Sequence, residues 1–547
     1  MPALTDQLKR EIGQHFVFGF HGYEPSEDIK VLIRDYFVGS VILFKRNIRD
    51  PAQVHRLIHE LQALAKESGH ARPLMIGIDQ ENGLVSAFSS PSVGTQFPGA
   101  MALASAGSPE LAEQVTAATA KELKAVGINW TYSPDADVNS EPKNPVIGVR
   151  SFGDNPLEIT PYVRAVQLGL EENLIAASAK HFPGHGDTHV DSHLSLPLIL
   201  KDKAALTRVE LVPFRALITG QIATIMTGHM ALPNITGSNT PCSLSRMISH
   251  DLLRGELGFK GVVRWRRYMG AVMSLLAGAD IAMVCHTMER QRGAVELAYK
   301  AVEAGELELE ESGRRVKVLK ETYAGSWDAV LNTPFDTAAF AAFAALKKDH
   351  AVLSEDVYNR SVALIQDPNR YLPLSGIGSV VLLTPINQSV NAAVDQDADE
   401  VLTTKEGQIR NTAGAHFASF ARCIARRTTE MQHVVYSPTD SEPPSSAVLD
   451  AADSIIFITR NADRAPWQIE YLKRILGKGK GKKVVVLASC APYDLLGASG
   501  DGVEDVAYVA SFEYTVEGLE AAARVLFGEV EARGVVPVLG GRVGPAA

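Results

Sequence analysis

The residues best suited to do chemistry lie in one short segment, Lys180–His193. Within these fourteen residues the sequence places four histidines, two aspartates and one lysine, interrupted by Pro183, Gly184 and Gly186. The preceding run, Ile175–Ala179, is apolar and typical of a buried parallel strand. The polar cluster therefore begins where a strand ends and continues into a loop. Loops held by a rigid sheet often carry functional residues, so this segment is the first candidate site.

A metal site is the main alternative interpretation of the cluster. Its histidines are spaced four residues apart, which would align metal ligands on the face of a helix. The prolines and glycines of the segment disfavour a helix, and no cysteine cluster accompanies it. We therefore expect no bound metal and no other cofactor. The four histidines are His181, His185, His189 and His193.

The elements that must position this loop recur along the first 290 residues. Eight short apolar runs alternate with amphipathic helical stretches such as Pro51–Lys66, and this alternation predicts a (β/α)8 barrel. Polar residues fall at the ends of several runs, where barrel enzymes keep their sites; they include Asp79, Asp137, His181, His229 and His286. The runs are Phe16–Phe20, Ser40–Phe44, Leu74–Asp79, Ile128–Ser133, Ile175–His181, Ala223–His229, Lys260–Arg264 and Asp280–His286.

A second alternation of strands and helices follows the barrel. We predict a barrel domain over residues 1–335, a helical linker over 336–357 and a smaller open α/β domain over 358–547. The five apolar runs of the second domain are Val380–Thr384, Val434–Ser437, Ile455–Thr459, Val484–Ala488 and Val506–Ser511.

Bulk composition narrows the class of protein. The chain has 547 residues, of which 46% are hydrophobic and 21% charged, as in ordinary globular proteins. Its net charge of −10 disfavours nucleic-acid and anionic-membrane partners. The N-terminus has no signal-like apolar core, and the four cysteines lack motif spacing, so we expect buried free thiols and a cytoplasmic location.

The segment Lys180–Thr188, followed by Asp191-Ser192-His193 and Leu196-Pro197, closely resembles the signature loop of glycoside hydrolase family 3, in its β-N-acetylglucosaminidase branch. Further matches are Ile78–Glu81, Asn144–Gly148 with Arg150–Gly153, and Met226–His229. The resemblance implies a barrel followed by an α/β domain and a retaining hydrolase that acts on terminal β-linked N-acetylglucosamine. The sequence leaves the aglycone and the oligomeric state open.

By this resemblance, His193 is the acid/base and Asp191 its carboxylate partner. A carboxylate bound to one ring nitrogen fixes the tautomer of a histidine and supports its charged form. The sugar-binding residues implied by the resemblance are Asp79, Arg150, Lys180 and His181. The stretch Glu81–Val85 departs from the commoner family form, and this departure affects the loop after Asp79.

The resemblance fails at the nucleophile. Family members follow Gly-Phe-x-Gly-Val-Val with a hydrophobic residue, Ser and the nucleophilic Asp, whereas this chain continues from Val263 with Arg264-Trp265-Arg266. Arg266 occupies the position of the nucleophile, and an arginine cannot attack an anomeric carbon. Relatives also have roughly a dozen more residues before Asp280. Either the gene has been misread here or the loss is real.

Three functions remain open at this point. The first is glycoside hydrolysis, impaired in this chain by the missing aspartate. The second is a catalytically inactive sugar-binding or regulatory protein. The third is a phosphorylase, because a histidine acid/base repels incoming phosphate less than a carboxylate does.

Overall fold

The structure is a computed structural model that describes residues 4–89, 93–189, 196–266, 270–285, 287–374, 376, 378–386, 413–440, 442–479 and 481–539. The chain divides into two compact units. The barrel unit comprises Met1–Phe97, Ala112–Val138 and Pro156–Val352. The second unit comprises Pro98–Leu111, Asn139–Asn155 and Leu353–Ala547.

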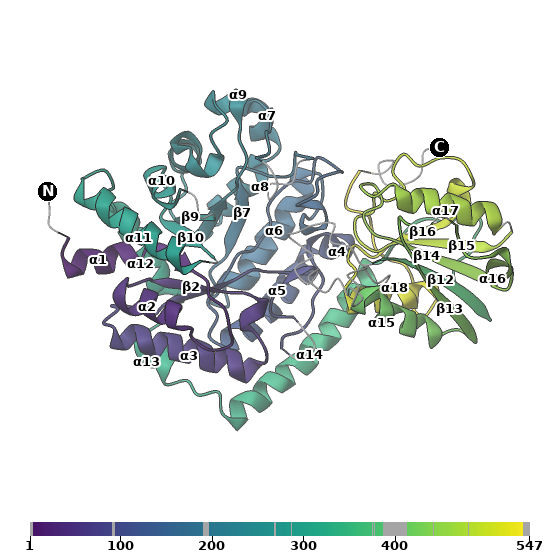
Figure 1. The fold of residues 1–547 in the computed structure, drawn as a ribbon, viewed down its shortest axis with the longest axis horizontal. Helices are drawn as coiled ribbons and strands as arrows, with labels where there is room; N and C mark the ends of the chain where they lie inside the picture. The colour runs from purple at the N-terminus through teal and green to yellow at the C-terminus, as the bar shows by residue number, and fades with distance from the viewer. Residues whose placement is uncertain are drawn as a thin grey trace. The chain divides into compact units, whose positions relative to one another are not determined.

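Eight parallel strands form the sheet of the barrel unit, in the order β6-β3-β2-β1-β10-β9-β8-β7 (Figure 1). The first and last strands of this order are joined next to Trp130, where the amide of Thr131 donates to the carbonyl of Ala176 at 2.9 Å. This link closes the sheet into the predicted (β/α)8 barrel. The strands are β1 (Phe16–Phe18), β2 (Ser40–Leu43), β3 (Met75–Ile78), β6 (Trp130–Thr131), β7 (Ser178–Phe182), β8 (Thr224–Thr227), β9 (Val262–Arg266) and β10 (Ile281–Val284).

Helices surround these strands, and local sequence signals set where several of them begin. The side chains of Thr5, Ser26 and Asp50 cap α1, α2 and α3 by accepting backbone N–H groups of the first turn. Pro51 follows its cap at the first helical position, where a missing N–H costs nothing. The main helices are α1 (Asp6–Gly13), α2 (Glu27–Asp35), α3 (Pro51–Glu67), α5 (Pro109–Ala125), α6 (Pro156–Glu171), α8 (Leu211–Thr219), the π-helix η4 (Met247–Glu256), α10 (Ala271–Leu276), α11 (Met288–Glu303), α12 (Glu310–Tyr323) and α14 (Thr337–Ser361).

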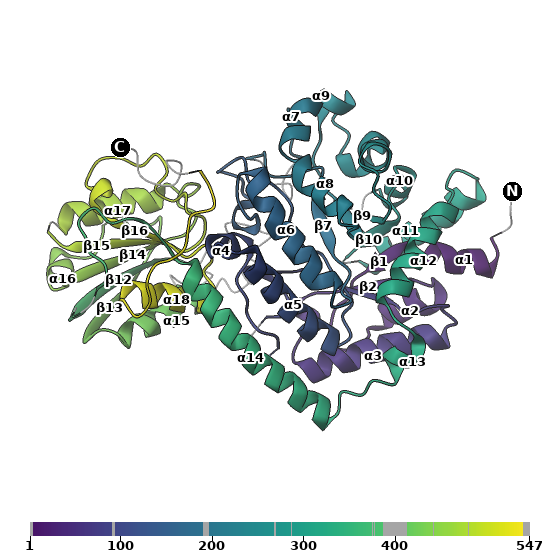
Figure 2. The ribbon, with the colours of Figure 1, turned by 180° about the vertical axis from the view of Figure 1, so that it is seen from behind.

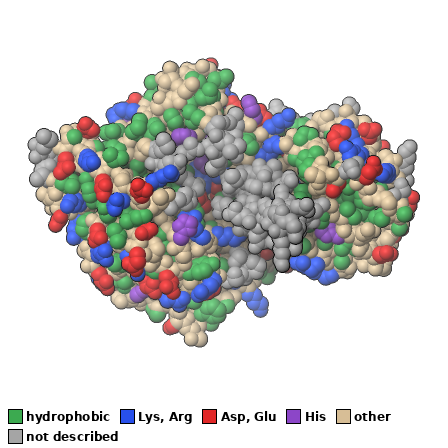
Figure 3. Space-filling model, viewed as in Figure 1, with side chains coloured by type: hydrophobic (Ala, Val, Ile, Leu, Met, Phe, Trp, Pro, Cys, Tyr) green, Lys and Arg blue, Asp and Glu red, His purple; other side chains and the backbone are tan. Residues whose placement is uncertain are grey.

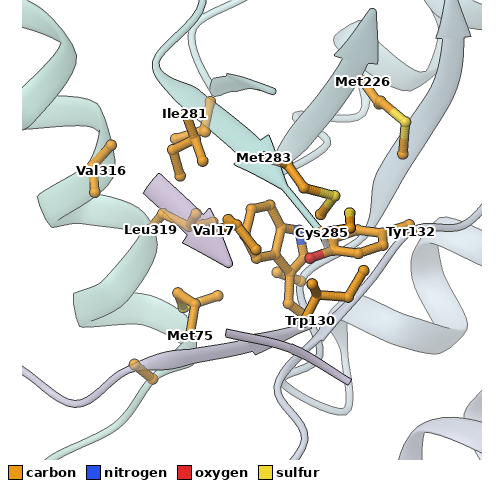
Figure 4. Close-up of a cluster of buried hydrophobic side chains, with 14 of the residues drawn as sticks. Val17, Met75, Trp130, Tyr132, Met226, Ile281, Met283, Cys285, Val316 and Leu319 are labelled. Atoms are coloured by element: carbon orange, nitrogen blue, oxygen red, sulfur yellow. The ribbon is translucent and has the colours of Figure 1, made fainter. Parts of the chain in front are cut away.

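The barrel interior is filled by apolar and aromatic side chains (Figure 4). Trp130 and Tyr132 pack edge to face at its centre, with ring centroids 5.2 Å apart. The hydroxyl of Tyr132 lies so close to Gly77 that a Cβ at that position would approach it to 2.1 Å. Glycine is therefore required at position 77 of β3 for Tyr132 to occupy the core.

The second unit has a six-stranded sheet in the order β11-β16-β15-β14-β12-β13. All of its strand pairs are parallel except β11 with β16, which are antiparallel. Helix α17 (Trp467–Lys478) covers one face, and α15 (Gly414–Ala425) and α18 (Val516–Leu526) cover the other (Figures 1 and 2). The strands are β11 (Ala363–Gln366), β12 (Ser379–Pro385), β13 (Glu430–Tyr436), β14 (Ser454–Thr459), β15 (Lys483–Ala488) and β16 (Ala507–Ala510).

The predicted fold class is therefore confirmed: every apolar run of both domains contains a strand. The antiparallel edge strand β11 was not among the predicted runs. The predicted domain bounds stay a prediction, although α14 covers most of the proposed helical linker.

Acidic and basic side chains are interspersed over the visible face of the barrel unit (Figure 3). Among the described residues no helix has both the length and the apolar composition needed to span a bilayer. The predicted free thiols are confirmed, since Cys242, Cys285, Cys423 and Cys490 are all buried and unbridged.

Candidate active site

A buried lysine between two carboxylates occupies the C-terminal end of the barrel. Lys180, on β7, is 1% exposed, and its Nζ lies 3.1 Å from Oδ1 of Asp79 and 2.5 Å from Oε1 of Glu81. Asp79 is the residue after β3, so the carboxyl ends of two strands supply the pair. An ammonium has three donors and a carboxylate accepts several hydrogen bonds, which suits both groups to sugar hydroxyls.

His181 is oriented by an aspartate from the loop after β6. Its Nδ1 lies 2.7 Å from Oδ2 of Asp137, and its backbone amide donates to Oδ1 of the same carboxylate at 3.2 Å. The amide of His185 also donates to Oδ1, at 2.7 Å. Nδ1 therefore carries the proton of neutral His181, and Nε2 is left as an acceptor. Burial raises the pKa of Asp137.

The loop after Asp79, where this chain departs from the commoner family form, folds into a short hairpin. Strand β4 (Gln80–Asn82) pairs antiparallel with β5 (Val85–Ser86), and Gly83 between them has a positive φ of 58°. The side chain of Gln80 fastens the hairpin by donating to Oγ of Ser86 at 2.6 Å. This hairpin carries Glu81 to its position against Lys180.

The base of the signature loop is anchored by a separate ion cluster. Lys201 lies 3.2 Å from Oδ2 of Asp187 and also pairs with the buried carboxylate of Glu210. Burial raises the pKa of Glu210. A Cβ at Gly184 would come within 2.5 Å of the Glu210 side chain, and Gly184 has a φ of 127°. The glycine and Asp187 of this motif thus serve the shape of the loop.

One group of described residues brings metal-type ligands together. Oxygen atoms of Asp135 and Asp137 and a ring nitrogen of His181 all lie within 4.8 Å of one another. The Asp137 carboxylate already accepts two backbone amides and the His181 ring, so a cation would have to displace one of these hydrogen bonds. The four-residue histidine spacing has no part in this group, because His181 lies on a strand and His185 in the loop that follows it.

The remaining predicted residues have different placements. Arg150 belongs to the second unit, on the short helix η2 (Gly148–Arg150); it is 8% exposed and donates to the carbonyl of Val146 at 3.0 Å. Nδ1 of His229 lies 3.2 Å from Oγ of Ser243. Asp191, His193 and His286 lie outside the described residues. The contacts above join Lys180 to Asp79 and His181 to Asp137, and all the site assignments stay predictions.

Comparison with known proteins identifies the family. Residues 7–319 match the Glycosyl hydrolase family 3 N terminal domain. The chain belongs to this family. β-Hexosaminidase A of Pseudoalteromonas piscicida is 28% identical over 603 residues, which cover 98% of this chain and 97% of that protein. β-Hexosaminidase of Thiobacillus denitrificans is 34% identical over 286 residues, which cover 49% of this chain and 77% of that protein.

Solved structures of the family agree with this assignment. The family 3 β-N-acetylglucosaminidase from Paenibacillus sp. str. FPU-7 superposes with a TM-score of 0.82 at 29% identity, covering 98% of this chain and 99% of that one. A fungal multi-domain family 3 β-N-acetylglucosaminidase gives a TM-score of 0.85 at 34% identity. This chain covers 60% of the fungal protein, and 97% of this chain is matched. The predicted family and branch are confirmed.

Strand β9 is the part of the barrel whose sequence differs from the family pattern. It runs to Arg266, whose backbone pairs in register with Met283 of β10. Arg264, at the position where the family has a hydrophobic residue, is fully buried, with its guanidinium 3.4 Å from the ring centroid of Tyr132 and its Nη1 3.0 Å from Sδ of Met283. The strand therefore accommodates the unusual sequence, and the absence of the nucleophile at Arg266 stays a prediction.

Two residues of the site had no role assigned from the sequence, although Asp137 was among the polar residues expected at the strand ends. Asp137 orients His181, and Glu81 shares Lys180 with Asp79. Asp137 had a sequence signal, because it falls just past an apolar run. Glu81 had none beyond its place in the family motif, since its contact with Lys180 depends on the hairpin after β3.

Proposed function

We propose that the barrel binds a terminal β-linked N-acetylglucosamine and that the chain is a β-N-acetylhexosaminidase-type glycoside hydrolase whose hydrolysis is impaired at β9. The observation that carries the binding half is the buried set of Asp79, Glu81 and Lys180, with His181 beside it presenting Nε2 as an acceptor. It is further supported by the full-length relative, a β-hexosaminidase, and by the match to family 3 β-N-acetylglucosaminidases.

Arg266 counts against the catalytic part of the proposed function. A retaining hydrolase needs a nucleophilic carboxylate below the anomeric carbon and a proton donor near the leaving oxygen. Asp191 and His193 are our proposed proton-transfer pair by family position. An arginine supplies no nucleophile, and its charge opposes an oxocarbenium-like transition state. A sugar-binding protein without hydrolase activity is therefore the second candidate, favoured by Arg266 itself.

The decisive experiment measures binding and turnover separately on the full chain. Isothermal titration with N-acetylglucosamine should detect binding, and Asp79→Asn should weaken it about 10- to 100-fold, because a charged hydrogen-bonding group contributes about 1.5–3 kcal/mol. The matched control is Asp28→Asn on the exposed surface of α2, which should leave the affinity unchanged. Equal affinity in wild type and Asp79→Asn would refute the proposed sugar site.

Turnover is then followed on a chromogenic N-acetylglucosaminide, with and without inorganic phosphate. Binding with negligible turnover supports the sugar-binding protein, whereas turnover that requires phosphate supports the phosphorylase. We also propose a cytoplasmic location, which is supported by the four buried free thiols, since disulfides are rare in reducing compartments.

A further inference from the structure

A cavity of about 600 Å³ lies at the N-terminal ends of the barrel strands. Three of its lining residues, His15, Phe37 and Arg72, shortly precede strands β1, β2 and β3 respectively. Helices α1 and α12, which lie side by side in Figures 1 and 2, contribute most of the others. Asp79 follows its strand, so this cavity is at the opposite end of the barrel from the candidate active site. Its volume is within the range of small-molecule sites.

The lining combines apolar surface with an excess of positive charge. Leu8, Ile12 and Phe37 contribute apolar side chains. Five cationic residues line the cavity against only two glutamates. The cations are Arg10, Arg72, Arg314, Lys317 and Lys320.

Lys320 is the unusual member of this group. It is 2% exposed, and its Nζ donates to Oε1 of Gln14 at 2.6 Å. The Gln14 amide is fixed in this orientation, because its Nε2 donates to the carbonyls of Arg10 and Phe37. Among the described residues, Lys320 forms no ion pair with a carboxylate. Lysines this deeply buried are normally paired, and this ammonium keeps two further N–H donors.

The groups that line the cavity with Lys320 include a second cation and two imidazoles. The guanidinium of Arg10 lies 4.0 Å from the ring centroid of Phe37, and its Nη1 donates to the carbonyls of Ser68 and Gly69. Burial lowers the pKa of His15, and it lowers that of His70 to about 4, so both imidazoles are neutral at pH 7. Arg72, Arg314 and Lys317 pair with glutamates of α12, so among the described residues Arg10 and Lys320 are the lining cations without a carboxylate partner.

We propose that this cavity binds a small organic anion whose carboxylate pairs with Lys320 and whose apolar body packs against Leu8, Ile12 and Phe37. Such a ligand supplies a negative charge that pairs with the buried ammonium. It also supplies an apolar surface that packs against the apolar side chains of the lining. A bare inorganic anion would supply only the charge. Because the site uses none of the residues of the sugar site, the proposal stands independently of the proposed function.

The test uses 2-naphthoate as the probe on the full chain, with 2-naphthalenemethanol as its neutral analogue and inorganic phosphate as the bare anion. We expect isothermal titration to give one naphthoate site, with at least tenfold weaker binding of the alcohol and of phosphate. Lys320→Met should reduce naphthoate affinity at least tenfold. The matched control, Lys300→Met, removes an exposed lysine of α11 that does not line the cavity and should change affinity less than threefold.

Two further measurements test where naphthoate binds and whether the Lys320 variants are folded. Asp79→Asn should leave naphthoate affinity unchanged, which separates this cavity from the sugar site. Circular dichroism and the urea midpoint check that Lys320→Met is folded, and Lys320→Arg, which keeps the charge, should retain more affinity than Lys320→Met. No naphthoate binding, equal binding of the alcohol, or binding unaffected by Lys320→Met would each overturn the proposal.

Discussion

Strands β7 and β9 each bury a cation in the same barrel, but they stabilise it in opposite ways. On β7, Lys180 lies between the carboxylates of Asp79 and Glu81. On β9, Arg264 lies over the faces of Tyr132 and Trp130, at 3.4 and 5.5 Å from their ring centroids. The first arrangement uses charges that also suit sugar hydroxyls. The second uses aromatic surface of the core, which has no role in a displacement at an anomeric carbon.

If the proposed function is correct, this contrast separates ligand binding on β7 from the loss of catalysis on β9. The carboxylate-paired lysine belongs to the half of the site that follows the family motif, and the arginine belongs to the half that departs from it. A chain with this combination is expected to hold a sugar without cleaving it at a family-like rate. The predictions below alter one side of this comparison at a time.

The largest expected effect concerns the segment after Val263. Replacing residues 264–269 with a family-length segment that bears Ser-Asp should raise kcat/KM on a chromogenic N-acetylglucosaminide by about 10³-fold or more, because a covalent nucleophile is restored. Arg266→Asp alone should not restore activity, since the missing dozen or so residues would leave the carboxylate misplaced, and small displacements are costly. Robust turnover by the unmodified chain would show that another group acts as nucleophile.

The second prediction removes the cation of β7. Lys180→Met should destabilise the protein by about 3–5 kcal/mol in urea unfolding and abolish N-acetylglucosamine binding, because two buried carboxylates lose the cation between them. The double variant Lys180→Met/Asp79→Asn should be more stable than Lys180→Met alone, since it removes one of the opposing charges. A double variant no more stable than the single one would contradict the pairing.

The matched variant on β9 is Arg264→Met. It should lower the free energy of unfolding by at least about 2 kcal/mol less than Lys180→Met does. The reason is that the rings of Tyr132 and Trp130 can pack against an apolar side chain whereas carboxylates cannot. Equal costs in the two variants would mean that the aromatic and carboxylate environments stabilise their cations alike.

The fold and half of the site were predictable from the sequence for the same reason. The (β/α)8 pattern depends on local apolar runs, which periodicity reveals, and the cluster around Lys180 and His181 is contiguous. The partners were not predictable in this way. Asp137 lies 44 residues before His181 and reaches it only when the barrel closes. Glu81 depends on the geometry of the hairpin after β3.

Contacts between residues far apart in the sequence are even less predictable at the N-terminal end of the barrel. Lys320 comes from α12 and Gln14 from the end of α1, which are 306 residues apart. No motif links them, and a lysine in a predicted helix is ordinarily assigned to the solvent-exposed face. Only the packed structure shows that this lysine is buried beside a cavity.

Lys320 is a third buried cation to compare with Lys180 and Arg264. Among the described residues it pairs with no carboxylate and contacts no aromatic ring. Desolvation lowers its pKa from 10.5 to about 7, with the nearby charge of Arg72 acting in the same direction. Because the unfolded chain binds the extra proton between pH 7 and 10.5, this group makes stability rise with pH across that window. Below pH 7 both states are protonated, and the folded state bears the whole cost of the buried charge.

Lys320→Met should therefore stabilise the protein by up to about 5 kcal/mol at pH 6 and by progressively less toward pH 10. Urea unfolding of wild type and variant at several pH values measures this difference directly. Lys317→Met, at a largely exposed position of the same helix, should show no such trend. A pH-independent difference between wild type and Lys320→Met would mean that Lys320 titrates normally in the folded protein.

The smallest expected effect concerns the tautomer of His181. In the Asp137→Asn variant we expect the one remaining side-chain oxygen to occupy the Oδ1 position, because the backbone amides of His181 and His185 donate there. The side-chain nitrogen then faces Nδ1 of His181. An amide nitrogen only donates, and the ring must then carry its proton on Nε2. Nε2 changes from an acceptor to a donor toward the pocket. We expect about tenfold weaker N-acetylglucosamine binding, equivalent to one hydrogen bond.

Nitrogen-15 NMR of the histidine rings can detect this exchange of tautomers without any ligand, and titration of the same samples gives the affinity. Asp28→Asn, on the exposed surface of α2, is the control and should leave the tautomer unchanged. If Asp137→Asn keeps the proton on Nδ1 and still binds tenfold more weakly, Asp137 acts through the shape of the loop and not through the ring of His181. If it keeps both the tautomer and the affinity, Asp137 has no part in sugar binding, and the recognition half of the site reduces to Lys180 and its two carboxylates.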